Sequence, residues 1–288
     1  MNPSHNPFRL PSIQLGKVFL VGAGPGAADL ITVRGAKLLA QADIVFHDAL
    51  VEPEMLALCP QATLVAVGKR CGKLSSAQQF INKRLVDAAH KYKIVVRLKG
   101  GDPMLFGRAD EELQALKAAG IEVAVVPGIT AALAGAASIG QSLTLRGVSR
   151  SVAFMTLAQG KDQQGAELPI SNPSADTLVY YMGRKDAAKI AQQLISQGPH
   201  TKDTPVQILE AVSTARERLW VSTLERMAQG SADQWFDSSS PALIMVGEAL
   251  RAVQTLEQNL EMALETTSSE IDDGLQDSSV LSNGRRRA

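Results

Sequence analysis

One stretch constrains the fold most: an apolar run that stops at a pair of glycines and is followed by an acidic segment. Ile94–Leu98 is apolar apart from one arginine, which is typical of a buried β-strand. In Gly100–Pro103 the two glycines let the backbone approach a ligand and the proline fixes the turn. We expect a helix to start near Arg108, because the acidic residues Asp110–Glu112 suit the positive end of a helix dipole. Together these elements predict a pocket at the carboxyl end of a strand, where open α/β sheets bind ligands.

A second glycine-rich turn lies near the start of the chain. Lys17–Val21 is a short apolar strand, Gly22–Gly26 follows it, and a helix is expected over residues 30–42. A glycine loop between a strand and a helix can hold a phosphate. Pro25 breaks the usual G-x-G-x-x-G spacing, so a tight turn without a ligand is an equally good interpretation of this loop.

Strands and helices alternate along most of the chain. The expected strands are 18–21, 43–46, 63–67, 94–98 and 122–126, then 151–157, 177–181, 205–209, 219–222 and 243–246. Further helices are expected over 76–89, 111–119, 186–196 and 248–265. This alternation predicts an α/β fold with mixed or mostly parallel sheets flanked by helices.

The composition and the polar stretches suggest how the chain is divided. We expect a flexible N-terminal tail over residues 1–15 and a disordered C-terminal tail over 266–288. Between them we expect a first α/β domain over 16–128, a connecting segment over 129–150 and a second α/β domain over 151–265. The C-terminal tail is rich in Ser, Asp and Glu before it ends in three arginines.

Charge and cysteine content exclude several classes of protein. Lys plus Arg and Asp plus Glu both number 29 among 288 residues, so no overall field attracts nucleic acid. Cys59 and Cys71 make neither a disulfide framework nor a metal site, and we expect no metal. No apolar run has the length of a membrane span, and residues 1–16 lack the apolar core of a signal peptide. We therefore expect a cytoplasmic protein that binds no membrane.

Short motifs follow one another in a fixed order over most of the chain, from about Gly16 to Leu250. They are Val21–Gly26, Ala42–Val45 leading to Asp48, Val67–Arg70, Arg97–Pro103, Phe106–Arg108 with Glu111 and Glu112, Val126–Ala132, Leu143–Gly147, Tyr181–Gly183 and Pro241–Ile244. No single motif is decisive, but this series resembles the tetrapyrrole methylase family, and within it the uroporphyrinogen-III C-methyltransferases.

The resemblance implies a fold and an activity. Members of the family have two α/β domains with the active site in the cleft between them, and they are homodimers. The implied reaction is the S-adenosylmethionine-dependent methylation of uroporphyrinogen III at C2 and C7, which gives precorrin-2 for sirohaem or cobalamin biosynthesis and S-adenosylhomocysteine as the second product. We expect a stand-alone enzyme, because no dehydrogenase–chelatase module has room before Gly16.

The resemblance also implies a set of cofactor-binding residues. They are Pro25, Gly100, Gly101, Asp102, Leu105, Thr130, Ala131, Met182, Val212 and Ala242. The chemistry is compatible, because Asp102 offers a carboxylate for a ribose hydroxyl or an amine, and Thr130 and Ala131 lie where a helix with free N–H groups begins. The alternatives are a turn-forming aspartate before proline at Asp102 and simple core packing at Met182.

Asp48 and Lys69 are the acid–base candidates. The resemblance assigns the proton acceptor to Asp48 and the proton donor to Lys69, and each follows an expected strand. A shifted pKa would suit either role at neutral pH. Positioning of the substrate by charge alone is the alternative for both residues.

Arg108, Glu111 and Arg146 are the substrate candidates. Uroporphyrinogen carries eight carboxylates, and arginine is the residue best suited to bind them in pairs of hydrogen bonds. Arg108 and Glu111 are three residues apart and share a helix face. The alternatives are a weak surface ion pair for these two residues and a solvated loop arginine for Arg146.

Two departures from the family pattern keep other functions open. Residues 156–159 lack a histidine that relatives carry, and Val212 stands where relatives have a glycine. A methylase of a different tetrapyrrole precursor, or a non-catalytic paralogue that binds tetrapyrrole or S-adenosylmethionine, therefore stays as an alternative. An RNA methylase is disfavoured by zero net charge and 4% aromatic residues, and a nicotinamide dehydrogenase by the spacing of the first glycine loop.

Overall fold

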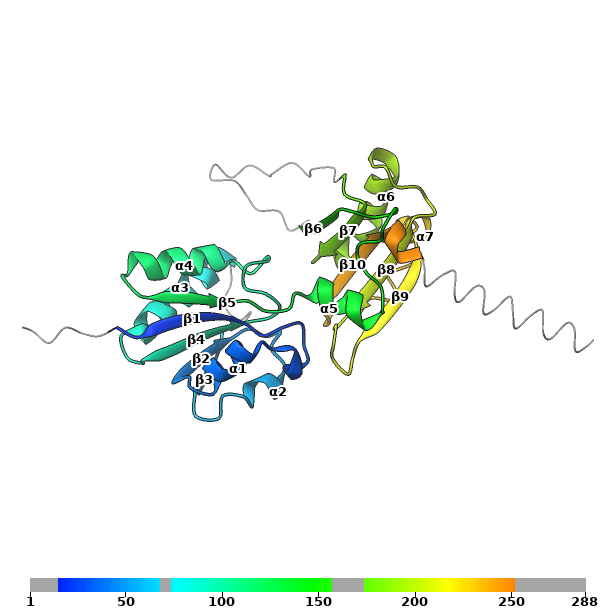
Figure 1. The fold of residues 1–288 in the computed structure, drawn as a ribbon. Coiled ribbons are helices and arrows are strands. Elements are labelled where there is room, and N and C mark those ends of the chain that lie inside the picture. Colours follow the sequence, from blue (N-terminus) through cyan, green and yellow to red (C-terminus); the bar gives the residue numbers. More distant parts are fainter. Residues whose placement is uncertain (1–14, 68–73, 157–173, 252–288) are drawn as a thin grey trace, which may run out of the picture. The chain divides into compact units, whose positions relative to one another are not determined.

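The computed structural model describes residues 15–67, 74–156 and 174–251. Contacts between residues divide the chain into two compact units. The first is Met1–Ser138 together with Leu209–Arg218, and the second is Ile139–Ile208 together with Leu219–Ala288. Each unit is built around a five-stranded sheet (Figure 1).

The first sheet is entirely parallel. Its strands are β1 (Lys17–Gly22), β2 (Ile44–His47), β3 (Thr63–Ala66), β4 (Ile94–Lys99) and β5 (Val123–Val126), in the order β3-β2-β4-β1-β5. β1 and β4 are neighbours, and Gly22 pairs with Lys99 at their carboxyl ends. The two glycine turns of the sequence therefore leave the same edge of the sheet side by side.

Helices cover both faces of this sheet (Figure 1). One face packs under α3 (Leu74–Ala89) and α4 (Ala109–Ala118), and the other under α1 (Val33–Leu39) and α2 (Pro53–Leu56). The unit also holds η1 (Ala28–Leu30) and α5 (Ala131–Ser138). Because side chains alternate along a strand, Val95 of β4 faces α3 and α4 whereas Val96 and Leu98 face α1 and α2.

The second sheet is mixed. Its strands are β6 (Val152–Thr156), β7 (Thr177–Tyr181), β8 (Pro205–Glu210), β9 (Arg218–Thr223) and β10 (Ala242–Gly247), in the order β6-β7-β10-β8-β9. β6 runs parallel to β7, and β10 runs antiparallel to it. The helical elements of this unit are η2 (Arg184–Asp186), α6 (Ala187–Gln197), α7 (Leu224–Ala228) and η3 (Glu248–Leu250).

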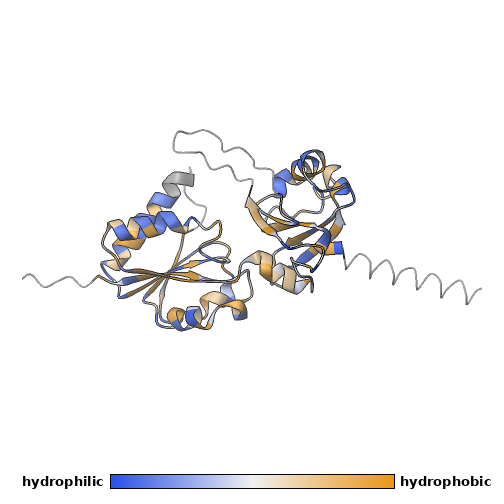
Figure 2. Cartoon of the chain, turned by 45° about the horizontal axis from the view of Figure 1, so that its top comes forward, coloured by the Kyte–Doolittle hydropathy of each residue, from blue (hydrophilic) through white to orange (hydrophobic). Residues whose placement is uncertain are grey.

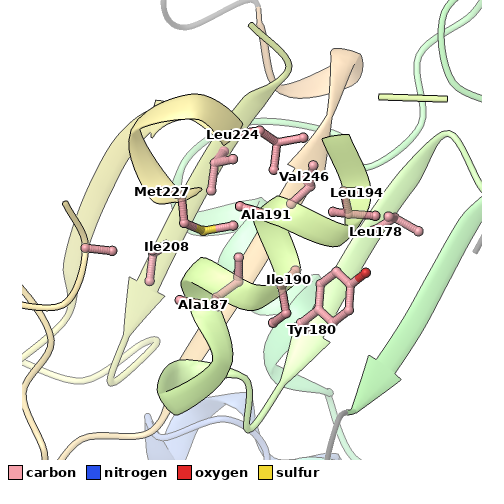
Figure 3. Packing of buried hydrophobic residues seen from close by; sticks show 13 residues of the cluster. Leu178, Tyr180, Ala187, Ile190, Ala191, Leu194, Ile208, Leu224, Met227 and Val246 are labelled. Carbon is pink, nitrogen blue, oxygen red and sulfur yellow. The ribbon is translucent and has the colours of Figure 1, made fainter. Parts of the chain in front are cut away.

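The core of the second unit is apolar. Ile190 and Leu194 of α6 pack with Met227 of α7 and with Ile208 and Val246 of the sheet (Figure 3). The strands of both units are mostly hydrophobic, whereas the helices carry hydrophilic patches (Figure 2). Among the described residues no helix is long and apolar enough to cross a membrane.

The expected α/β fold is confirmed, and all ten expected strands are present within one or two residues of their predicted ends. The helix expected over 30–42 is shorter, because Thr32 caps it and α1 begins at Val33. The short helices α2 and α7 were not expected. Residues 1–14 of the expected N-terminal tail, the whole expected C-terminal tail, and the helix expected over 248–265 beyond residue 251 lie outside the described residues.

Candidate functional site

The loops after β1 and β4 are joined to each other. The Gly101 N–H donates to the Gly24 carbonyl at 2.6 Å, and the Gly24 N–H donates to the Gly101 carbonyl at 3.2 Å. Gly24 and Gly101 both have a left-handed backbone, with φ values of +78° and +68°. Such values suit glycine, which explains why both turns carry it.

The end of β5 packs against the same two loops. A Cβ on Gly128 would lie 2.3 Å from the Gly101 carbonyl oxygen and 2.8 Å from the Gly22 Cα atom. These distances are far shorter than any normal contact, so only glycine fits. Gly22 and Gly128 were not singled out as site residues from the sequence. Their role here is to let three strand ends approach closely.

Asp102 holds this arrangement together. Its Oδ2 atom accepts the Gly128 N–H at 2.8 Å, and its Oδ1 atom accepts the Met104 N–H at 2.8 Å. The turn-forming interpretation of Asp102 therefore has a direct basis in the structure. Each carboxylate oxygen retains a second lone pair. Thr130 lies beside the same turn, since a Cβ on Gly101 would be 4.0 Å from the Thr130 Cα atom.

Strained backbone marks three loops that the sequence singled out. Among the described residues, the non-glycine residues with positive φ are Phe106, Arg108, Met182, Ala211 and Ser213. The first two follow β4, Met182 follows β7, and Ala211 and Ser213 follow β8. A left-handed backbone costs a non-glycine residue about 1–2 kcal/mol. Strain of this kind gathers at ligand-binding and catalytic sites, so these loops are favoured as functional segments.

The loop between β8 and β9 lies against the first glycine turn. The Ala27 N–H donates to the Ser213 Oγ atom at 3.0 Å. A Cβ on Gly26 would lie 2.6 Å from Thr214 Cγ2 and 2.8 Å from the Val212 carbonyl oxygen. The Val212 side chain is buried and packs near Gly135 of α5. Val212 therefore presents backbone, rather than side chain, to the turn that contains Pro25.

Beneath the β4 loop lies a buried cluster of charges. Arg97 and Lys99 of β4 are each 3% exposed, and Glu112 of α4 is fully buried. Glu112 accepts the Arg97 Nε–H at 3.1 Å and the Lys99 ammonium at 3.1 and 3.2 Å. The Arg97 Nη2 atom donates to Asp48 Oδ1 at the end of β2. The cluster thus holds two cations and two carboxylates.

The cluster shifts the pKa values of its own cations. Burial lowers the pKa of Lys99, and the nearby Arg97 charge acts in the same direction, against the attraction of Glu112. For Arg97, burial alone would lower the pKa, but the charges of Asp48 and Glu112 and their hydrogen bonds raise it. Sequence reasoning identified Asp48 but missed the buried partners. Two cations at alternate positions of one apolar strand were the available signal.

The structure also locates the candidate substrate residues. Arg108 forms a two-point ion pair with Glu111, Nε to Oε1 at 2.7 Å and Nη2 to Oε2 at 2.8 Å. Both side chains are exposed. Arg146 is exposed in a turn of the second unit, closed by the backbone pairing of Leu145 with Ser149.

The remaining predicted residues fall into two groups. Pro25, Gly100, Gly101, Asp102, Leu105, Thr130, Ala131 and Val212 belong to the first unit, in the loops described above. Met182 and Ala242 belong to the second unit and are neighbours, since Tyr181 pairs with Leu243 in the adjacent strands. Lys69 and residues 157–159 lie outside the described residues. No cluster of metal-ligating side chains occurs within the described part of the chain.

A comparison with known families decides which fold this is. The family of Tetrapyrrole (Corrin/Porphyrin) Methylases matches residues 17–228, which is most of the chain. The chain belongs to the tetrapyrrole methylase family. The family resemblance seen in the sequence is thereby confirmed.

Individual tetrapyrrole methylases show how far the similarity extends. The chain is 42% identical to the uroporphyrinogen-III C-methyltransferase of Pseudomonas aeruginosa, over 83% of this chain and 96% of that protein. It is 41% identical to siroheme synthase 1 of Klebsiella pneumoniae, over 90% of this chain but 54% of that protein. The chain thus spans about half the length of the siroheme synthases that it matches.

Among solved structures, a uroporphyrin-III C-methyl transferase from Thermus thermophilus is similar. In its complex with S-adenyl homocysteine it has 36% sequence identity and a TM-score of 0.69, covering 82% of this chain and 94% of that one. A cobalt precorrin-4 methyltransferase has 27% identity and a TM-score of 0.67. The two-domain tetrapyrrole methylase fold expected from the sequence is confirmed by these matches, while the cleft between the domains stays a prediction.

Proposed function

We propose that this chain methylates uroporphyrinogen III at C2 and C7 with S-adenosylmethionine and so forms precorrin-2. The observation that carries the proposal is the match to the Pseudomonas aeruginosa uroporphyrinogen-III C-methyltransferase over 96% of that enzyme's length. The likeness to the Thermus thermophilus structure complexed with S-adenyl homocysteine supports the choice of cofactor. The product would feed sirohaem or cobalamin biosynthesis.

The loops of the first unit fit S-adenosylmethionine. Gly100 and Gly101 carry no side chains, so a flat base or a ribose can approach the backbone. Asp102 is held by two backbone N–H groups and still has lone pairs for a hydroxyl or an amine. The start of α5 at Ala131 supplies the positive end of a helix dipole for the cofactor carboxylate. When bound, the cofactor supplies an electrophilic methyl group.

The chain's own residues would orient the substrate and move protons. Asp48 is 30% exposed, and Arg97 fixes one of its oxygens, which suits a carboxylate that accepts a proton from the ring. We assign the proton donor to Lys69. Glu111 holds the guanidinium of Arg108 in one orientation, and Arg108 and Arg146 would bind carboxylates of the tetrapyrrole.

The finer parts of the proposal concern assembly and location. Met182, Val212 and Ala242 would complete the cofactor site together with the loops after β1, β4 and β5. We further propose that the enzyme works as a homodimer in the cytoplasm, on a small-molecule substrate, without nucleic acid or membrane. Equilibrium sedimentation of the full chain would test the homodimer.

The proposed activity is tested by an anaerobic assay with uroporphyrinogen III and S-adenosylmethionine, with the product weighed by mass spectrometry. We expect the gain of two methyl groups and the release of S-adenosylhomocysteine. The variant Asp48→Asn removes the proposed proton acceptor, and general acid–base groups contribute about 10²–10⁴-fold, so it should lose rate on that scale. Glu122→Gln, a change at an exposed ion pair with Lys17, is the matched control and should keep full activity.

Two other outcomes would change the assignment. The likeness to a cobalt precorrin-4 methyltransferase, at 27% identity, makes a methylase of a different tetrapyrrole precursor the second candidate. Methyl gain with a later corrin precursor and none with uroporphyrinogen III would establish that candidate. Binding of S-adenosylmethionine in calorimetry without methyl gain on any tetrapyrrole would instead indicate a non-catalytic paralogue.

A further inference from the structure

Glu112 lies at the centre of the buried cluster. It comes from α4, is fully buried, and accepts hydrogen bonds from Arg97, Lys99 and Gln78 at 3.1–3.2 Å. Gln78 reaches it from α3 and also donates to Asn82. An uncompensated charge at such a depth would be costly, so a carboxylate with this many donors is firmly held.

Arg97 connects Glu112 to Asp48. Its Nε atom donates to Glu112, its Nη2 atom to Asp48, and its Nη1 atom to the Leu98 carbonyl at 3.1 Å. All three nitrogens of the planar guanidinium therefore donate hydrogen bonds. Because the group is rigid and 3% exposed, a displacement at Glu112 would move the Asp48 carboxylate as well.

Asp48 is the member of the cluster that reaches solvent. Its side chain is 30% exposed, whereas those of Arg97, Lys99 and Glu112 are 0–3% exposed. The cluster thus runs from a fixed point inside the first unit to a carboxylate at the edge of the sheet, where the strand ends meet. We propose that Glu112 is a positioning residue, which fixes the Asp48 carboxylate through Arg97. This inference rests on the proposed function of Asp48.

The competing role for Glu112 is local charge balance. Lys99 has Glu112 as its carboxylate partner, so Glu112 could serve to neutralise Lys99 and do nothing for Asp48. The two roles differ in what Arg97 needs. Positioning requires an acceptor for the Arg97 Nε–H, whereas charge balance requires only that no buried ammonium is left alone.

A pair of double variants separates these roles. Lys99→Met/Glu112→Gln and Lys99→Met/Glu112→Met both remove one positive and one negative charge, so the cluster stays neutral. Gln and Met have similar shapes, but only the amide oxygen of Gln can accept the Arg97 Nε–H. The two proteins therefore differ in the acceptor offered to Arg97 and to Gln78, and in the amide N–H donors that Gln adds.

Positioning predicts different kinetics for the two proteins in the uroporphyrinogen III assay. The Gln variant should keep kcat within a few-fold of the unaltered chain. The Met variant should lose about 10²-fold in kcat, the cost expected for a misplaced catalytic group, with KM for S-adenosylmethionine unchanged. Equal kcat values in two folded variants would overturn the proposal and leave charge balance as the role of Glu112.

Crystal structures of the two variants give a test that needs no activity. The Arg97–Asp48 hydrogen bond should persist in the Gln variant and be broken or displaced in the Met variant. An unchanged bond in both would refute positioning even if the chain proves inactive on uroporphyrinogen III, so failure of the proposed function is distinguishable. Should the Met variant not fold, Lys99→Met/Glu112→Leu provides a second apolar side chain for the same comparison.

Discussion

β4 and β10 occupy the same place in their sheets but differ in chemistry. Each is the third of five strands and so has neighbours on both sides. β10 carries Ile244, Met245 and Val246, all completely buried and apolar. β4 carries Arg97 and Lys99, which are each 3% exposed. A central strand is therefore not obliged to be apolar, provided that partners for its charges fold around it.

The difference indicates which sheet carries the acid–base site that we propose. A buried ion cluster is no more stable than well-packed apolar side chains of the same volume, and often less so. The second sheet shows that this fold can build a central strand without charges. The charged residues of β4 are then best explained by the loops that leave its end, among them the one that holds Asp102.

The largest expected effect comes from breaking the cluster on β4. Arg97→Met leaves the Asp48 and Glu112 carboxylates without their shared cation, and loss of one partner from a buried pair costs about 3–5 kcal/mol. Urea denaturation should show this loss of unfolding free energy. Met245→Leu in β10 is the matched change between apolar residues and should cost less than about 1.5 kcal/mol. A similar loss of unfolding free energy in the two variants would contradict the contrast drawn between β4 and β10.

The next largest loss of stability is expected from a cavity in the core of the second unit. Leu194 is almost fully buried among the apolar side chains of α6, α7 and the sheet. Leu194→Ala should lower the unfolding free energy by about 3 kcal/mol, within the range for buried leucines. Calorimetric titration should give an unchanged affinity for S-adenosylmethionine per folded molecule. A large loss of affinity in the folded variant would mean that this core also shapes the cofactor site.

A smaller effect is expected where strand ends meet in the first unit. Gly128→Ala places a Cβ 2.3 Å from the Gly101 carbonyl oxygen, and overpacking of this kind costs about 1–3 kcal/mol. The affinity for S-adenosylmethionine should fall with it, because the Asp102 turn must shift.

Gly135→Ala in α5 is the control for that variant. Its new Cβ would meet its nearest neighbours at 3.7 Å, an ordinary contact, and alanine favours a helix over glycine by about 0.5–1 kcal/mol. The melting temperature should rise slightly. If Gly128→Ala were equally well tolerated, the close approach of the three strand ends would not constrain the site.

The smallest effect is a difference in acid sensitivity at the start of the second sheet. Hydrogen bonds from the Ser151 hydroxyl and from the backbone N–H groups of Arg150 and Ser151 lower the pKa of Asp176 below 3.8. The unfolded chain then binds the proton more tightly than the folded one. The stabilisation is complete above pH 3.8 and is lost as the pH falls through the lower folded value.

Asp176→Asn should therefore make the melting temperature depend less on pH in the acid range. The melting temperature of the unaltered protein should fall more steeply below pH 3.8 than that of the variant. Lys99 changes stability in the same direction with pH but in another range, because burial lowers the pKa of this lysine and its destabilising effect is relieved as the pH rises toward 10.5. An identical fall of the melting temperature with pH in both proteins would show that Asp176 contributes nothing to stability through its charge.

The strands and their turns were predictable because their signals are local. Short, mostly apolar runs set most of the ten strands, β4 and β5 are followed directly by glycine or proline, and the turn at Gly100–Pro103 is visible in the sequence. The start of α4 was predicted near Arg108 from the acidic residues that follow, and α4 begins at Ala109 with Asp110 in its first turn. Glu112 was interpreted in the same way, yet it turns inward and is fully buried.

What the sequence could not supply were partners far apart along the chain. Arg97 joins Asp48, 49 residues away, to Glu112. Ser213 meets Ala27 across 186 residues. Neither contact has a periodic or spacing signal, because each depends on how the strands are ordered in the sheet. The sequence therefore indicated which loops matter better than it indicated what holds their side chains.

The two-part make-up of the first unit has a consequence for synthesis of the protein. Its sheet is complete once Val126 has been added, but Leu209–Arg218 belongs to the same unit and comes much later in the chain. At about 5–20 residues per second, a ribosome needs several seconds to make the intervening segment. During that time the turn at Gly26 lacks the loop that packs against it in the finished protein. The incomplete first unit would then be the part of the nascent chain most open to chaperones and proteases.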